Sequence, residues 1–185
     1  SIKTGDTLLI IESETLKAQK KSIQTKIREI TLEIGDLEKL VRINPDDSIF
    51  LKSGFRTERY YSEYSRMRNS IAIQALKCQK AKSEFERNRQ LHEELLIADS
   101  EFENIQFSYN SENENMHQIF NSEISKWNSE LSERKNENTS LVADLESCLE
   151  QMKNRVIVAS MGGEIISSSE IQPGTIVNAN QQVAQ

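Results

Sequence analysis

Two short strand-forming segments at opposite ends of the chain constrain its fold more than any other feature. Residues 155–177 are rich in Val and Ile and carry almost no charge. Residues 7–11 form a second short apolar run, which follows turn-forming residues at 3–6. A strand pair this small does not fold alone in water. The sequence therefore predicts that the two ends of the chain pair with each other as one small sheet.

Between these ends the chain is charged, poor in glycine and patterned like long helices. In the first helical stretch the apolar residues recur at spacings of three, four and seven, which is typical of a heptad seam. This seam consists of Leu16, Ile23, Ile27, Ile30, Ile34, Leu37 and Val41. Ser13 is the expected N-cap, and Pro45 is expected to end the helix because a residue before proline disfavours the α region.

Two further seams predict two further helices. The second seam consists of Tyr60, Tyr64, Met67, Ile71, Ala75, Cys78 and Phe85. The third consists of Phe102, Ile105, Tyr109, Met116, Phe120, Ile124, Trp127 and Leu131, followed by Val142, Leu145, Leu149 and Met152. Ser100 and Glu103 fit a capping box at the start of the third helix. Between its two parts, at 132–140, the seam positions are polar, and we expect that window to be loosely packed or to face water.

We therefore expect helices at about 13–43, 55–96 and 99–153, with a hairpin tip at 97–99. At about 1.5 Å per residue their lengths are near 45, 63 and 80 Å, so three helices should lie side by side near the β end and taper to two at the tip. The predicted fold is mainly α, a long antiparallel coiled-coil hairpin with a small split β domain. That domain comprises 1–12 and 154–185, and the helices occupy 13–153.

Composition excludes several classes of function. The net charge of −6 and the scattered basic residues argue against nucleic acid as the main partner, because phosphate binding requires concentrated Lys and Arg. No apolar run approaches the roughly 20 residues that span a bilayer. The sequence opens as if inside a folded unit, so we expect a piece of a longer protein. Cys78 and Cys148 are expected to be free thiols in the seams, and His92 and His117 to be solvent-facing helix residues.

Short motifs at both ends resemble a known family. Gly5-Asp6-Thr7-Leu8 resembles the close of one biotinyl-lipoyl half-motif. Four segments near the other end resemble the second half-motif. They are Val156 to Ala159, Gly163 to Ile165, Pro173 to Val177 and Gln181-Gln182-Val183. A lipoyl domain that is split by a coiled coil is similar to the HlyD-type membrane fusion proteins, the periplasmic adaptors of bacterial tripartite exporters. The resemblance covers the whole chain in architecture.

This resemblance implies a function and a site. It implies an adaptor in the periplasm of a Gram-negative cell that links an inner-membrane transporter to a TolC-like outer-membrane channel. It further implies a ring of several copies and a membrane anchor in an N-terminal segment outside this chain. Arg87 and Leu91 match the family's arginine and leucine near the hairpin tip, which engage the channel. Ala98 stands where the family has serine, unless Ser100 takes that place.

Catalysis is not expected. True lipoyl and biotinyl domains present a lysine for covalent modification, whereas Ser160-Met161-Gly162-Gly163 contains none. The sequence shows no nucleophile–base pair, metal cluster or phosphate loop, so we predict no cofactor and no enzyme activity. The alternative to an adaptor is a structural coiled-coil tether or scaffold with a small β cap.

Overall fold

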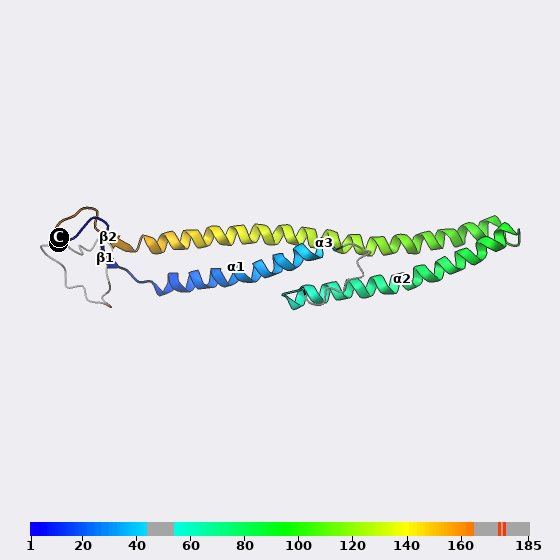
Figure 1. Ribbon diagram of the computed structural model, residues 1–185, viewed down its shortest axis with the longest axis horizontal. Coiled ribbons are helices and arrows are strands. Elements are labelled where there is room, and N and C mark those ends of the chain that lie inside the picture. The colour runs from blue at the N-terminus through cyan, green and yellow to red at the C-terminus, as the bar shows by residue number, and fades with distance from the viewer. Residues whose placement is uncertain (44–53, 165–173, 175, 177–185) are drawn as a thin grey trace. The chain divides into compact units, whose positions relative to one another are not determined.

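The computed structural model describes residues 1–43, 54–164, 174 and 176. The elements, in chain order, are β1 (Thr7–Ile10), α1 (Glu14–Leu40), α2 (Glu58–Glu93), α3 (Asp99–Lys153) and β2 (Val156–Val158) (Figure 1). Three long helices pack antiparallel, and the two strands form a small antiparallel sheet. The predicted mainly α fold class is therefore confirmed. The loop expected after the first helix and most of the second half-motif beyond Glu164 lie outside the described residues.

The two ends of the chain form one sheet, as the strand-forming segments predicted. The register pairs Thr7 with Val158, Leu9 with Ile157 and Ile10 with Val156, with a shift between Thr7 and Leu9. A bridge between Ile2 and Gly163 extends the pairing. At the other end of the ladder, the Ile11 N–H donates to the Arg155 carbonyl at 2.9 Å. Residues that are about 150 positions apart in sequence thus lie at strand-pairing distance.

The turn before β1 follows from its sequence. The Asp6 N–H donates to the Lys3 carbonyl at 3.1 Å, and the Lys3 N–H donates to Asp6 Oδ2 at 2.8 Å. Gly5 has φ of 91°, which a type II turn requires at its third residue and which glycine adopts without steric cost. The Gly5 N–H then donates to the Ala159 carbonyl at 2.9 Å, so the turn also joins the two ends.

The chain divides into two compact units, residues 1–27 with 139–185 and residues 28–138. The core of the first unit lies between α1 and α3. It consists of Leu16, Ile23 and Cys148, with Ile27, Leu141, Leu145 and Met152 packed against it. Ser13 is the N-cap as predicted, because its Oγ accepts the Leu16 N–H at 3.3 Å. The α3 seam differs from the prediction here, since Val142 and Leu149 are 39% and 41% exposed.

The core of the second unit joins all three helices. Its buried residues are Leu37 and Leu40 from α1, Tyr60, Tyr64 and Met67 from α2, and Trp127 from α3. We expected three helices side by side near the β end. That expectation is wrong, because the described core of the unit that contains the sheet consists of residues from α1 and α3 only. The reason is that α1 and α2 are shorter than expected and α2 begins beside the end of α1. Asp36 of α1 accepts the Thr57 N–H at 2.7 Å just before α2 starts.

Polar residues also pack between the helices of the second unit. Arg134 Nε lies 2.9 Å from Glu33 Oε2, and Lys135 Nζ lies 2.7 Å from Glu38 Oε1. Two residues of the polar window of α3 thus pair with α1, while most of the window is exposed to water, as expected. On α2, Gln74 rather than the expected Ala75 occupies the buried seam position, and its amide donates to the Glu112 carbonyl at 3.0 Å. Within the described parts of the chain, no helix is long and apolar enough to cross a membrane.

Candidate functional site

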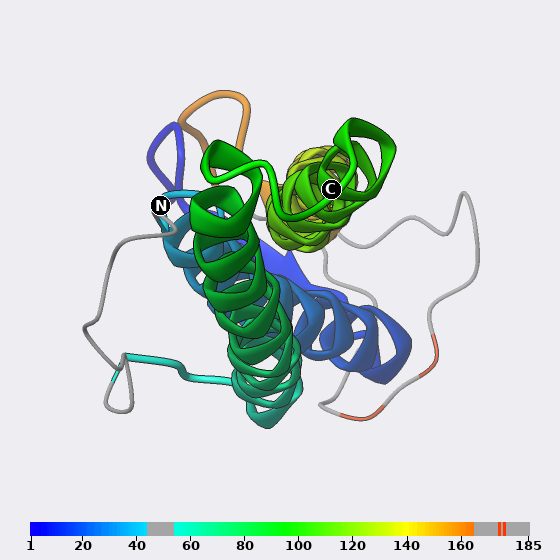
Figure 2. The ribbon, with the colours of Figure 1, turned by 90° about the vertical axis from the view of Figure 1, so that its right-hand side faces the viewer.

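The hairpin tip that connects α2 to α3 is closed by a Schellman motif. The Leu96 N–H donates to the Leu91 carbonyl at 2.8 Å, and the Leu95 N–H donates to the His92 carbonyl at 2.9 Å. Figure 2, seen from this end of the molecule, shows the turn. Leu95 occupies the left-handed position of the motif, with φ of 60°. Glycine is usual there, because a residue with a Cβ pays roughly 1–2 kcal/mol for this conformation.

The same turn exposes two large apolar side chains. Leu95 is 88% exposed and Leu96 is 65% exposed. Leu95 thus combines a backbone strain with an apolar surface in water, and neither feature stabilises the hairpin. Strained residues and exposed apolar groups are enriched at binding sites. These two leucines are therefore the candidate functional site.

Aromatic side chains of α2 and α3 stack on one another next to the turn. Phe85 of α2 stacks on Tyr109 and Phe102 of α3, with ring centroids 5.5 and 5.6 Å apart. His92 stacks on the same Phe102, with a centroid distance of 4.4 Å, and its Nε2 lies 2.8 Å from Asp99 Oδ1. These contacts join the end of α2 to the start of α3. The exposed leucines therefore project from a supported turn rather than from a free loop.

The four site residues suggested by the family resemblance lie around this turn in different settings. Arg87 is exposed on α2, and Leu91 is half-buried with its carbonyl in the Schellman motif. Ala98 is exposed, and its carbonyl accepts the N–H groups of Glu101 and Phe102, each at 3.1 Å. Ser100 is exposed within the first turn of α3. Their role in docking stays a prediction.

Two features of the tip were not found from the sequence. The capping box expected at Ser100 and Glu103 is wrong, because Ala98 holds the N-cap position and Asp99 already begins α3. Leu95 and Leu96 were not selected as site residues. The available signal was an apolar pair at a helix end that lacks the glycine a C-terminal cap normally uses. In the described parts of the chain, no group of three His, Cys, Asp or Glu residues could hold a metal ion.

Comparison with known proteins gives a likeness in structure but none in sequence. No family model matches the chain, and no curated protein matches it by sequence. Among solved structures, the chain is similar to the periplasmic adaptor protein EmrA, at 18% sequence identity and a TM-score of 0.42. The alignment covers 99% of this chain and 64% of the EmrA chain. A likeness at this level does not define a family, so the function must be argued from the residues.

Replacing Leu95 with glycine should stabilise the hairpin. We expect Leu95→Gly to raise the free energy of unfolding by about 0.5–1 kcal/mol, because relief of the left-handed strain exceeds the entropy that glycine loses on folding. Urea denaturation followed by circular dichroism measures the change. Leu96→Gly is the matched control and should not stabilise, since Leu95 is the only non-glycine residue with positive φ in the described chain. If Leu95→Gly is less stable than the unmodified chain, the inferred backbone strain at Leu95 is wrong.

Proposed function

We propose that this chain is the helical arm of a periplasmic adaptor, which links an inner-membrane transporter to a TolC-like outer-membrane channel in a Gram-negative cell. The observation that carries the proposal is Leu95, an 88% exposed side chain held in a strained conformation at the tip. Such a residue costs free energy in the isolated chain, so a partner that buries it explains why it is there. A channel with apolar grooves between its helices would be a partner of that kind.

The arrangement of the chain also supports this role. The two ends pair in one sheet, so both ends of the helical insertion start from a single β module. The arm leaves this module through α1 and returns to it through α3. A helical insertion that begins and ends in one β module suits a linker between two other proteins. The proposed role is mechanical and requires no catalysis, and the membrane anchor and the contacts with the transporter would lie in other parts of the full protein.

The alternative of a structural tether or scaffold explains less of the tip. A tether needs a long helical hairpin, which this chain has. It does not need a large apolar side chain where glycine would be more stable, followed by a second exposed leucine. The two roles differ in one testable respect, which is whether the tip touches an outer-membrane protein.

Site-directed crosslinking in exporting cells tests the proposal. Cys78 and Cys148 are first replaced by Ser and Ala, and a cysteine is then introduced at Ala98, which is exposed beside the turn. We expect a covalent adduct with cysteines placed at the periplasmic end of the TolC-like channel. A cysteine at Ser140, exposed on α3 but in the other compact unit, is the control and should give no adduct. No adduct from the tip in cells that export would overturn tip docking.

A charge at the turn should abolish docking without unfolding the arm. We expect Leu95→Asp to reduce adduct formation and export by about tenfold or more, because burying one leucine is worth roughly 1.5–3 kcal/mol and 1.4 kcal/mol is a factor of ten. Val142→Asp replaces another exposed apolar residue, on α3 in the other unit, and should leave both unchanged. Equal effects of the two substitutions would point to general destabilisation and contradict the proposal.

A further inference from the structure

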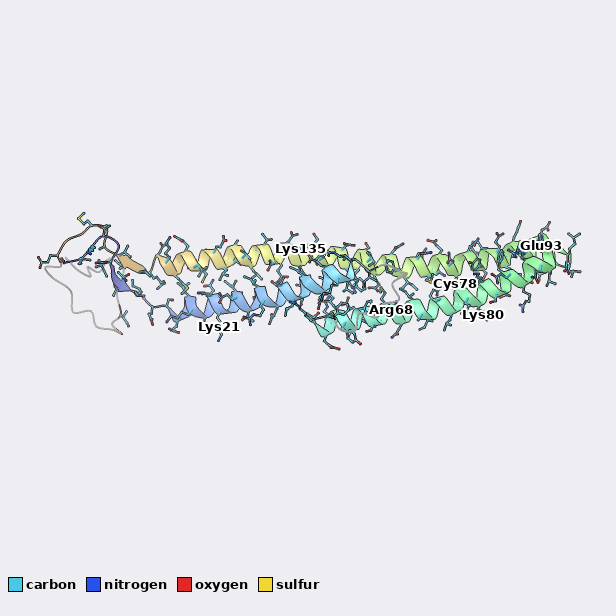
Figure 3. All side chains as sticks on the ribbon, in the orientation of Figure 1. Lys21, Arg68, Cys78, Lys80, Glu93 and Lys135 are labelled. Carbon is cyan, nitrogen blue, oxygen red and sulfur yellow. The ribbon has the colours of Figure 1, made fainter. Side chains whose placement is uncertain are left out.

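Carboxylates surround the turn between α2 and α3. Residues 90–103 contain five Asp or Glu and no Lys or Arg. All five acidic residues are exposed, namely Glu93, Glu94, Asp99, Glu101 and Glu103. Figure 3 shows Glu93 at the end of α2, next to the turn. The exposed leucines of the turn, Leu95 and Leu96, therefore lie among negative charges.

The helix ends explain the carboxylates of α3 but not those of α2. Asp99 and Glu101 lie in the first turn of α3, where the partial positive charge of a helix N-terminus stabilises acidic side chains. Glu93 is the last residue of α2, and Glu94 is its C-cap. The C-terminus of a helix carries a partial negative charge, which disfavours an acidic side chain. Glu93 and Glu94 thus lie where the backbone favours a basic residue.

The contacts within the described chain leave Glu94 as the carboxylate without a cation next to the leucines. Glu93 Oε1 lies 3.7 Å from Arg89 Nε, in an exposed pair whose order along the helix is the weaker one. Asp99 Oδ1 lies 2.8 Å from His92 Nε2. Glu94 forms no ion pair with any residue that the structure describes. Its negative charge is therefore available to a partner.

Burial of Leu95 by a partner would also affect Glu94, because the two residues are adjacent in the chain. A partner surface that covers Leu95 removes water from the neighbouring carboxylate as well. A charged group that loses water costs free energy unless an opposite charge replaces the lost hydration. A Lys or Arg side chain on the partner would supply that charge and would bind the carboxylate by a charge-assisted hydrogen bond.

We propose that the tip recognises an apolar groove with Lys or Arg on its rim, and that Glu94 selects for this positive charge. The inference rests on the tip docking proposed above and adds the chemistry of the surface that is bound. It differs from the contact that the family resemblance implies, which uses Arg87. Arg87 lies eight residues before Leu95, about 12 Å along the helix, whereas the charges nearest the leucines are negative.

Glu94→Lys tests the proposal because it should change stability and docking in opposite directions. The urea midpoint of the chain should rise, since a lysine suits the C-terminus of α2 and relieves repulsion among the carboxylates. Docking should fall, because the lysine then faces the cations of the partner. We expect about tenfold less channel adduct from Ala98→Cys, in the chain with Cys78 and Cys148 replaced as above. Glu94→Gln removes the charge without reversing it and should lower the yield by about threefold.

Glu84→Lys is the matched control for net charge. Glu84 is exposed on the same helix, ten residues before Glu94, and forms no ion pair within the described residues. Its reversal should leave adduct formation unchanged. A rescue experiment locates the partner's cation. Each Lys or Arg in the crosslinked segment of the channel is changed to Glu in cells that carry Glu94→Lys, and one of these changes should restore the adduct.

The outcomes separate this inference from docking itself. Absence of an adduct from the tip with Glu94 intact would overturn the docking on which the inference rests. If that adduct forms, an unchanged or higher yield with Glu94→Lys would overturn the role of Glu94 alone. Equal losses from Glu84→Lys and Glu94→Lys, or no rescue by any charge reversal in the channel, would also overturn it.

Discussion

Replacing Trp127 with alanine should lower the free energy of unfolding of the second unit by about 4–5 kcal/mol, at the upper end of large-to-small core substitutions. Trp127 is fully buried and is the α3 member of the core that joins all three helices. Its removal would open a cavity between α1, α2 and α3, and three separate helices cannot all move in to fill it. Alanine at this position therefore loses packing with every helix of the unit.

The substitution also removes a buried hydrogen bond. Trp127 Nε1 donates to Glu63 Oε2 at 3.1 Å, and the same carboxylate is bound by Lys126 at 3.0 Å and Arg59 at 3.2 Å. Burial raises the pKa of Glu63, but hydrogen bonds from Lys126 and Trp127 lower it by more. The pKa of Glu63 is therefore below its ordinary value. Glu63 is therefore charged in the folded chain and needs its donors.

Two variants separate packing from hydrogen bonding. Trp127→Phe keeps an aromatic ring but loses the donor, and we expect it to cost about 1.5–3 kcal/mol, the range for a hydrogen bond to a charged group. Unfolding must be followed by circular dichroism, because Trp127 is the only tryptophan and its fluorescence is lost. Equal costs for the alanine and phenylalanine variants would show that packing of the indole contributes little.

The sequence predicted the helices well where one apolar residue per turn stands alone. The α1 seam is of this kind, and Leu16, Ile23, Ile30 and Leu37 are all buried. It failed by one residue where two apolar residues are adjacent. In Leu141-Val142 the periodicity allows either member, and packing against α1 selects Leu141. In Cys148-Leu149 both residues were expected in a seam, and only Cys148 is buried.

Long-range polar contacts account for the remaining differences. Gln74 is buried because its amide reaches the carbonyl and carboxylate of Glu112, a partner that is 38 residues away. The tip shows the same limit, because nothing local indicates that Leu95 would adopt the conformation glycine prefers. The pairing of the two chain ends could be predicted because both ends carry consecutive apolar residues, whereas the apolar residues of the helical region mostly recur at spacings of three and four.

Asp36 determines where α2 begins, and its replacement should give the second largest loss of stability. The carboxylate is fully buried and accepts the N–H groups of Arg56 and Thr57 at 2.9 and 2.7 Å. It also accepts the Thr57 hydroxyl at 2.8 Å and Lys39 Nζ at 3.3 Å. Thr57 itself makes no side-chain cap, so a residue of α1 supplies the acceptor that the start of α2 lacks.

We expect Asp36→Ala to lower the free energy of unfolding by about 3 kcal/mol, because it leaves buried donors unpaired and removes the cap. Asp36→Asn is the matched control, since it keeps the size but replaces one acceptor oxygen with an amide that cannot accept. It should cost somewhat less than alanine at neutral pH. Urea denaturation of all three proteins measures both losses. Loss of less than about 1 kcal/mol in Asp36→Ala would contradict the capping role.

The pH dependence of the free energy of unfolding tests the charge of Asp36 separately from its packing. Burial raises the pKa of Asp36, but hydrogen bonds from Arg56 and Thr57 lower it by more. The pKa of Asp36 is therefore below its ordinary value. A lowered folded pKa means that the stabilisation is complete above the unfolded value, near 3.9, and is lost as the pH falls through the folded pKa. The advantage of the unmodified chain over Asp36→Asn should therefore shrink in acid. An advantage of the same size at pH 7 and in strong acid would show that the charge of Asp36 does not hold the start of α2.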